Sequence, residues 1–326
     1  MKTLAPETTD HPFLKALKPE FQEKLTAAAK EKNCAPGEII FKQGEPANRF
    51  YLVLSGAVAL ETADTRTKEV QVHCLRAGEV LGWSWLFAPF AWQFTARAVA
   101  PCRLLELDGA RLLVACEENA DLGFEIMKQI APVVIGRLQS TRKTLLASPS
   151  AKLLATDDYA KGPTHPAERC EQNGLEELIR THPFTRGMKA EHLKEMIHNG
   201  MLLQFNAGDS IFGEGDVANR FYLIESGAVV LEAPLKDHSV IPLQVIGAGD
   251  VLGWSWLFPP YYWHFDARAL QPTRAIFFYG TRLREACEEN HALGYDLMKR
   301  MIRIVIQRLQ ATRKQLVDAH VPVNCE

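Results

Sequence analysis

Short hydrophobic segments alternate with turn signals through much of the chain, a pattern typical of β-strands. Residues 49–54, Arg-Phe-Tyr-Leu-Val-Leu, are rich in aromatic and branched side chains and are followed by Ser55-Gly56, which predicts a strand closed by a turn. We expect a turn and strand over 34–41 and further strands over 57–61, 70–75, 94–99 and 103–107. Strands this short, with a turn signal about every 10 residues, predict a β-sandwich or jelly roll rather than alternating strands and helices.

Two kinds of helix are expected beside these strands. A short polar helix is predicted over residues 18–32, with a counterpart over 189–199. Near the end of the chain, apolar residues recur at the three-to-four spacing of an amphipathic helix: Leu293, Leu297, Met298, Met301, Ile302, Val305 and Leu309. An earlier segment shows the same pattern: Leu122, Ile126, Ile130, Val133, Val134 and Leu138. Pro132 lies inside this earlier segment, and we expect it to kink the helix or to end its first part.

The whole pattern occurs twice. The eight residues 80–87, Val-Leu-Gly-Trp-Ser-Trp-Leu-Phe, return letter for letter at 251–258, an offset of 171 positions. This offset exceeds the period of a solenoid repeat, which indicates tandem duplication of a complete domain of about 140 residues. We therefore predict a first domain over 1–147, a proline-containing linker over 148–173, a second domain over 174–320 and a short tail over 321–326. A residue present in only one copy is a poor candidate for chemistry shared by both.

Composition and charge narrow the function classes. Hydrophobic residues make up 47% of the chain and charged residues 23%, as in ordinary globular proteins. The net charge of -2 gives no sign of a general affinity for nucleic acid or anionic lipid. The seven cysteines show no pairing pattern, so we expect free thiols in a reducing compartment. There is no signal-peptide core and no apolar run of about 18 residues, so we expect a cytoplasmic protein without a transmembrane segment.

Several short motifs resemble the cyclic nucleotide-binding domain, the sensor domain of the catabolite-activator and Fnr-like family, of protein kinase A regulatory subunits and of gated channels. The matching segments are Pro-Gly-Glu-Ile-Ile-Phe at 36–41, Tyr-Leu-Val-Leu-Ser-Gly-Ala-Val at 51–58, Gly-Glu-Val-Leu-Gly at 78–82 and Ala-Arg-Ala at 96–98. The second copy repeats them from residue 207 onward. The resemblance implies a mainly β fold of two tandem double-stranded β-helix (jelly-roll) domains. It also implies eight strands in each domain, flanking helices and a long C-terminal helix near the ligand pocket.

The polar anchors of that family are replaced in both copies. The family's glycine at the position of Gly82 is followed by a glutamate that accepts from the ribose hydroxyl, whereas Trp83 and Trp254 follow the glycine here. The arginine that pairs with the cyclic phosphate corresponds to Trp92 and Trp263. Tryptophan supplies one neutral N–H where arginine supplies a charged bidentate group. We therefore expect altered pockets that do not bind cAMP or cGMP in the usual way.

The candidate ligand-binding residues form two equivalent sets. The first is Gly82, Trp83, Ser84, Trp85, Trp92, Gln93 and Arg97, and the second is Gly253, Trp254, Ser255, Trp256, Trp263, His264 and Arg268. Backbone N–H groups after Gly82, or an inward turn of Arg97 and Arg268, are alternative anchors for an anion. We consider three roles for the tryptophans: they fill a lost pocket, they line a pocket for a flat or apolar ligand, or they form a surface for a protein partner or lipid.

No arrangement of residues predicts catalysis, a resident metal or another resident cofactor. Histidines do not recur at equivalent positions with ligand spacing, and the basic residues near the helix ends, among them Arg142 and Arg313, are expected to complement the helix dipole. Twelve residues follow Lys314, which is too few for a helix-turn-helix, so no DNA-binding module is expected.

The sequence thus predicts a non-enzymatic regulatory or sensor protein that signals through its terminal helices or through an unknown protein partner. The helices are expected to pair within the chain as a pseudo-dimer or between chains as a homodimer. Two alternatives stay open. One is a scaffold subunit with tryptophan-filled, ligand-free pockets, and the other is a true cyclic nucleotide regulator with unusual anchors.

Overall fold

The computed structural model describes residues 10–62, 70–148, 168–169, 172, 174–234 and 240–318. Contacts divide the chain into two compact units. Unit 1 comprises Met1–Thr141 and Leu309–Glu326, and unit 2 comprises Arg142–Arg308. Each unit therefore contains the strands of one copy together with the end of the helix that closes the other copy. The predicted domain boundaries remain predictions, since most of the linker and the tail lies outside the described residues.

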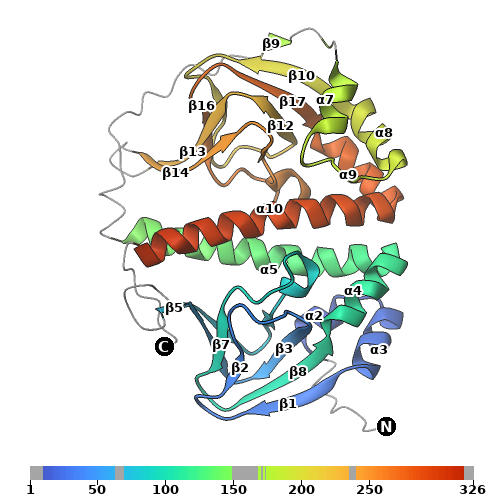
Figure 1. The fold of residues 1–326 in the computed structure, drawn as a ribbon, viewed down its shortest axis with the longest axis vertical. Coiled ribbons are helices and arrows are strands. Elements are labelled where there is room, and N and C mark those ends of the chain that lie inside the picture. The colour runs from blue at the N-terminus through green and yellow to red at the C-terminus, as the bar shows by residue number, and fades with distance from the viewer. Residues whose placement is uncertain are drawn as a thin grey trace. The chain divides into compact units, whose positions relative to one another are not determined.

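The described residues of unit 1 form eight strands in two antiparallel four-stranded sheets. Figure 1 draws the strands of this unit as arrows. In sheet order the first holds β1 (Lys30–Cys34), β8 (Cys102–Asp108), β3 (Arg49–Ser55) and β6 (Val80–Leu81), and the second holds β2 (Ile39–Phe41), β7 (Thr95–Ala98), β4 (Ala57–Thr62) and β5 (Val70–Arg76). Except for β4 and β5, neighbours in these sheets are not consecutive in the sequence, as in a jelly roll. This arrangement confirms the predicted mainly β fold.

Unit 2 repeats the two sheets with one added edge strand. The first holds β15 (Val251–Leu252), β12 (Arg220–Ser226), β17 (Thr273–Tyr279), β10 (Gly200–Phe205) and β9 (Glu168–Arg169), and the second holds β11 (Ser210–Phe212), β16 (Asp266–Ala269), β13 (Ala228–Pro234) and β14 (Val240–Gly247). Register is repeated as well: Tyr51 pairs with Leu81 in β6, and Tyr222 pairs with Leu252 in β15.

Helices flank the strands in both units. Unit 1 has α2 (Pro12–Lys15), α3 (Pro19–Ala27), the 3-10 helix η1 (Ser84–Leu86), α4 (Gly109–Glu118) and most of α5 (Ala120–Ala147). Unit 2 has α7 (Leu175–Thr181), α8 (Ala190–Asn199), η2 (Ser255–Leu257), α9 (Gly280–Glu289) and most of α10 (His291–Asp318). The two long helices α5 and α10 confirm the expected C-terminal helix of each copy.

One local prediction was wrong, and one of the two alternatives given for Pro132 is excluded. The helix expected over residues 18–32 ends at Ala27, because Lys30–Cys34 pairs with β8, and this ladder outweighs a weak helical pattern. Helix α5 does not end at Pro132. A proline removes one backbone hydrogen bond, but Ile130, Ala131 and Val134 around it are fully buried, and their packing holds the helix through that turn.

Most described cysteines form no disulfide, as expected: Cys34, Cys102, Cys116 and Cys287 are buried thiols. Cys74 differs, because it is disulfide-bonded. Spacing along the sequence does not report which thiols approach in space, which is why this disulfide was missed.

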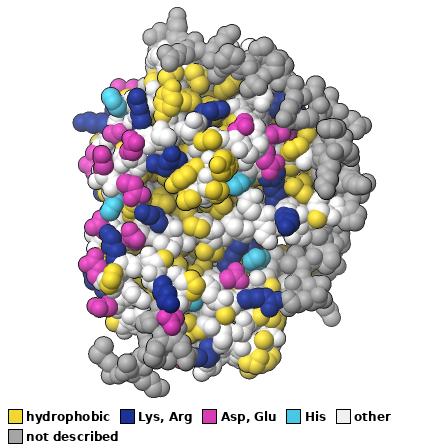
Figure 2. All heavy atoms as spheres, turned by 180° about the vertical axis from the view of Figure 1, so that it is seen from behind, with side chains coloured by type: hydrophobic (Ala, Val, Ile, Leu, Met, Phe, Trp, Pro, Cys, Tyr) yellow, Lys and Arg dark blue, Asp and Glu magenta, His cyan; other side chains and the backbone are white. Residues whose placement is uncertain are grey.

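The exterior is mixed in character. Figure 2 shows one face, on which basic and acidic side chains are interspersed among hydrophobic ones. Among the helices that the structure describes, none combines the length and the apolar character that crossing a bilayer requires.

Candidate ligand-binding site

The candidate residues lie in a duplicated cassette, residues 82–97 in unit 1 and 253–268 in unit 2, that begins with a glycine in both units. Gly82 has a φ of 83° and Gly253 a φ of 85°, a region that residues with a Cβ atom seldom adopt. A Cβ atom at Gly82 would lie 2.7 Å from the ring of Trp92, and one at Gly253 would lie 2.8 Å from the ring of Trp263. Glycine is therefore required both for the turn and for the close approach of the indole.

Trp92 and Trp263 are part of the interior. Trp92 is 4% exposed and stacks on Phe41, with ring centroids 3.9 Å apart and an angle of 14° between the planes. Trp263 stacks on Phe212 at the same centroid distance and an angle of 12°. In unit 1 the core around Trp92 draws residues from both sheets. Each indole is thus held by an aromatic stack inside its unit.

The tryptophan directly after each glycine is also buried but has a different neighbour in each unit. The guanidinium carbon of Arg137 lies 4.3 Å from the ring centroid of Trp83, and Arg137 Nη2 donates to the carbonyl of Val80 over 2.5 Å. Trp254 stacks instead on the imidazole of His264, with centroids 5.2 Å apart. Each indole offers a single neutral N–H donor and no carboxylate.

The remaining serine and tryptophan of each cassette belong to the 3-10 helices: Ser84 and Trp85, and Ser255 and Trp256. Trp85 packs on Phe50, with ring centroids 5.7 Å apart, and Trp256 stacks on the equivalent Phe221 at 4.8 Å. All six tryptophans of the chain are buried: Trp83, Trp85, Trp92, Trp254, Trp256 and Trp263. They do not form a surface for a partner or lipid.

The arginines proposed as alternative anchors are held in ion pairs on the second sheet of each unit. Arg97 Nε lies 3.0 Å from Glu61 Oε2, one strand away. Arg268 Nη2 lies 2.5 Å from Glu232 Oε1, and Glu232 is itself buried. These pairs fix Arg97 and Arg268 in structural contacts and leave no support for an inward turn toward a ligand.

Unit 1 nevertheless contains a pocket beside the first cassette, with a volume of about 450 Å³. Its lining comes from the strands and their loops and from the end of α10: Gln43, Thr62, Val72, Gln93, Phe94, Gln310, Arg313, Lys314, Val317 and Asp318. Of the predicted site residues, only Gln93 lines this pocket, and its Nε2 donates to the carbonyl of Ala91 over 3.2 Å. The other predicted site residues lie outside this lining, and their role in ligand binding remains a prediction.

Arg313 is the residue that gives this pocket its character. Its side chain is 3% exposed, and its guanidinium carbon lies 4.7 Å from the ring centroid of Phe94. Within the described part of the chain, its Nε and Nη2 atoms have no hydrogen-bond partner. Burial, and then the neighbouring charge of Arg137, lower the pKa of Arg313 to about 9. The pocket therefore contains a buried cation that lacks compensating hydrogen bonds at two of its nitrogens.

Arg142 occupies the equivalent position in unit 2. Its guanidinium carbon lies 4.5 Å from the ring centroid of Phe265, and its Nη2 lies 3.1 Å from Glu214 Oε2. Burial lowers the pKa of Arg142, whereas the charges of Glu214 and Asp266 act to raise it. Burial, and then the charge of Arg142, lower the pKa of His264 to about 4. In unit 2 the arginine is thus matched by acids from the same unit.

Arg142 and Arg313 were missed as pocket residues. Their sequence signal was present, since they recur at the 171-residue offset, but we expected them at solvated helix ends. Both side chains are in fact buried. Equivalence between copies does not reveal which strands a helix end contacts, so the sequence could not place them here.

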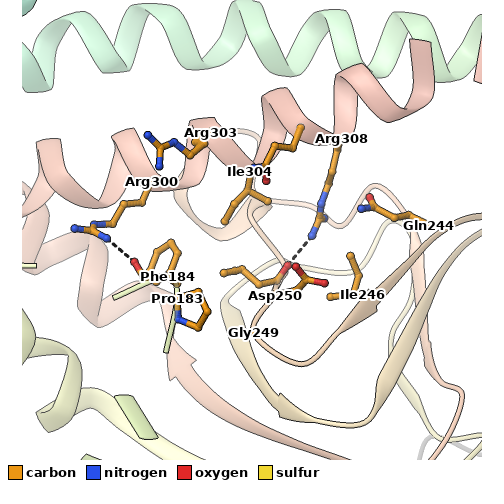
Figure 3. Close-up of a pocket in the computed structure, with 12 residues that line it drawn as sticks. Pro183, Phe184, Gln244, Ile246, Gly249, Asp250, Arg300, Arg303, Ile304 and Arg308 are labelled. Atoms are coloured by element: carbon orange, nitrogen blue, oxygen red, sulfur yellow. Dashed lines mark hydrogen bonds between the residues drawn. The ribbon is translucent and has the colours of Figure 1, made fainter. Parts of the chain in front are cut away.

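A separate cavity of about 300 Å³ lies in unit 2, between α10 and the turn that precedes β15. Figure 3 shows this cavity. Arg300 Nη1 donates to the carbonyl of Phe184 over 2.6 Å, and Arg308 Nη2 donates to the carbonyl of Val251 over 2.6 Å. Burial lowers the pKa of Arg308 to about 10, and Asp250 opposes this. These guanidiniums are engaged with backbone groups, so the cavity is a weaker candidate for a charged ligand.

Comparison with known proteins agrees with the fold. Residues 31–119 and 202–290 each match the cyclic nucleotide-binding domain. A curated relative from Mycobacterium tuberculosis, a CRP-like cAMP-activated global transcriptional regulator, is 22% identical over 144 residues, which cover 44% of this chain and 62% of the relative. The chain thus spans less than two thirds of the length of this relative.

Two solved structures of other proteins are also similar to this chain. The N-terminal domain of a transcriptional regulator from Streptomyces coelicolor is 25% identical, covers 42% of this chain and 94% of its own, and superposes with a TM-score of 0.33. The regulatory domain of Toxoplasma gondii PKA with cAMP is 16% identical, covers 91% of this chain and 96% of its own, and has a TM-score of 0.33. Since the two segments that match the domain model make up more than half of the sequence, the chain belongs to the cyclic nucleotide-binding domain family and carries two such domains in tandem.

Proposed function

We propose that this protein is a non-enzymatic regulator whose two domains do not hold a cyclic nucleotide in the manner of the family. The matched domain is a binding domain found in regulatory proteins, which supports a regulatory role. The response of the protein to its ligand would pass through α5 and α10. The end of α10 supports this route, because it forms one wall of the pocket of unit 1. We expect the output to reach a protein partner, and a cytoplasmic location remains a prediction.

The observation that carries this proposal is the pair of stacks between Trp92 and Phe41 and between Trp263 and Phe212. A cyclic phosphate carries a full negative charge, and burying that charge without a cationic partner costs several kcal/mol. An indole that is stacked inside the core cannot supply this partner. The loss occurs in both domains, so neither can substitute for the other.

A second candidate function is a scaffold subunit with ligand-free pockets. It is supported by the burial of all six tryptophans and by the internal ion pair of Arg142 in unit 2. The open volume of about 450 Å³ in unit 1 favours the ligand-responsive regulator over this alternative.

The test uses thermal unfolding and tryptophan fluorescence of the full chain with cAMP and cGMP. A ligand at 100 times its dissociation constant adds about 2.7 kcal/mol of stability, so binding is readily detected. We expect no change for the wild-type protein. The variant Trp92→Arg should be destabilised alone and partly restored by cAMP, because the phosphate compensates the introduced charge.

Trp92→Gln is the matched control, since it disturbs the same stack without adding a charge and should gain nothing from cAMP. Stabilisation of the wild-type protein by either nucleotide would contradict the proposal and would favour a true cyclic nucleotide regulator with unusual anchors.

A further inference from the structure

The pocket of unit 1 has a wall that carries positive charge. Arg313 lines the pocket, and the charge of Arg137 acts on it. Burial, and then the charges of Arg137 and Arg313, lower the pKa of the nearby His73 to about 3. The Nε2 atom of His73 and the Nε atom of Arg137 also have no hydrogen-bond partner among the described residues. A buried guanidinium is stabilised only when its charge and its N–H groups are compensated, so this wall is complete only with an added acceptor.

The two copies differ at the positions that decide this compensation. Glu214 and Asp266, which face Arg142 in unit 2, correspond to Gln43 and Thr95 in unit 1. The local geometry is retained: the backbone N–H of Glu214 donates to Asp266 Oδ1 over 2.7 Å, and that of Gln43 donates to Thr95 Oγ1 over 3.1 Å. Two acids have thus been replaced by two neutral polar residues without a change in the fold around them.

The other lining residues do not replace the missing charge. Among the described residues that line the pocket, Asp318 is the one carboxylate, and it lies exposed near the end of α10, as does Lys314. Gln93 and Thr62 supply neutral polar groups, and Thr62 Oγ1 already lies 3.4 Å from Gln43 Oε1. The pocket therefore combines a buried cation, neutral hydrogen-bonding groups and an open volume.

The geometry points to a binding site in unit 1 for a small organic anion, whose carboxylate or phosphate group lies on Arg313 and whose remaining part lies against Phe94, Val72 and Val317. This inference rests on the proposed regulator and names the class of its ligand. Unit 2 has no such site, because Glu214 and Asp266 already supply the negative charge to Arg142. One chain would therefore bind one anion, and the ligand would contact α10 directly.

Inorganic phosphate and malonate serve as probes of the two anion chemistries, and binding to the full chain is followed by calorimetry and by tryptophan fluorescence. Both anions also stabilise proteins in general by exclusion from the surface, so the specific effect is the difference between two variants. Arg313→Gln should weaken binding by about 10- to 100-fold, since it removes charge-assisted hydrogen bonds. Arg142→Gln, the matched change in unit 2, should leave the affinity of unit 1 unchanged. A response to phosphate alone or to malonate alone identifies which group the pocket selects.

Exchanging the differing residues between copies gives an independent test that does not depend on the folding of Arg313→Gln. The double variant Gln43→Glu, Thr95→Asp should abolish anion binding and raise thermal stability, because it supplies the acids within unit 1. The reverse double variant Glu214→Gln, Asp266→Thr should raise the stoichiometry from one anion to two.

If neither probe binds, or if binding is the same in Arg313→Gln and Arg142→Gln, the inference is wrong. Stabilisation of the wild-type chain by cAMP would refute the proposed function. Loss of that stabilisation in Arg313→Gln would uphold the anion site, and its persistence in Arg313→Gln would count against the site.

Discussion

Two pairs of buried arginines recur at equivalent positions of the two copies, and the pairs differ in their contacts. Arg137 and Arg308 recur at equivalent positions, and each donates to the backbone carbonyl at the start of a short strand, at Val80 and Val251. These contacts are the same in both units and therefore serve the fold. The second pair, Arg142 and Arg313, has the same place in each unit but different partners. Differences of function between the units are thus expected at the second pair and not at the first.

His73 allows the positive wall of unit 1 to be tested through pH. Burial, and then the charges of Arg137 and Arg313, lower its pKa from 6.5 to about 3. Between these values the unfolded chain binds a proton that the folded chain does not, so the free energy of unfolding decreases as the pH falls through this window. The variant His73→Gln, which introduces the residue found at the equivalent Gln244, should show a weaker decrease.

Urea denaturation of both proteins at a series of pH values below 6.5 provides the measurement. Equal slopes for the wild-type chain and His73→Gln would mean that burial and the two neighbouring arginines do not lower the pKa of this imidazole.

At the scale of elements, the ends of the long helices stand out because they belong to the unit built from the other copy. Helix α5 passes from unit 1 into unit 2 after Thr141, and α10 passes from unit 2 into unit 1 after Arg308. The last residues of α10 line the pocket of unit 1, and Val317 packs against its core. A strand element of one copy and a helix element of the other thus build one site.

Truncation of Val317 tests this exchange of elements. Val317→Ala should destabilise unit 1 by about 1–2 kcal/mol, because it removes buried apolar surface from the core of the first copy. Hydrogen exchange should therefore increase in strands β4 and β5, which are far from the mutated residue in the sequence. Lys314→Ala, an exposed change in the same helix, is the control and should alter stability by less than about 0.5 kcal/mol. Faster exchange confined to the second copy in Val317→Ala would contradict the assignment of this helix end to unit 1.

How much of this could be read from the sequence depends on the range of the interactions. The strands and the duplicated cassette follow from local patterns and from the fixed offset between copies. The β1 pairing, the burial of Trp92 on Phe41 and the contact of Arg313 with Phe94 do not, because each joins segments that are distant along the chain. Offsets show which residues are equivalent, whereas contacts decide which of them share a pocket.

At the scale of the whole molecule, each unit needs residues from both copies, so the copies should not be independent folding units. Residues 1–147 expressed alone lack Arg313, Val317 and the rest of the α10 wall of the pocket. We expect this fragment to unfold at a lower temperature than the same region in the full chain. A loss of each kcal/mol lowers the midpoint by a few degrees, on the order of 4 °C, for a domain of this size.

Adding residues 148–326 as a second polypeptide should restore part of that stability, because it returns the end of α10. Differential scanning calorimetry of the separate and mixed fragments measures this. A fragment 1–147 as stable as the intact chain would show that the helix end contributes nothing to the first unit.

The difference between Gln43 and Glu214 has a consequence for how such a protein can evolve. When two identical subunits assemble, a single gene specifies both binding sites, and a substitution alters them together. Fusion of the two copies into one polypeptide removes that constraint, so the charge in one site can be balanced by its own side chains while the equivalent site is kept for a metabolite. A permanently occupied half would then act as an internal reference, against which the responsive half changes state.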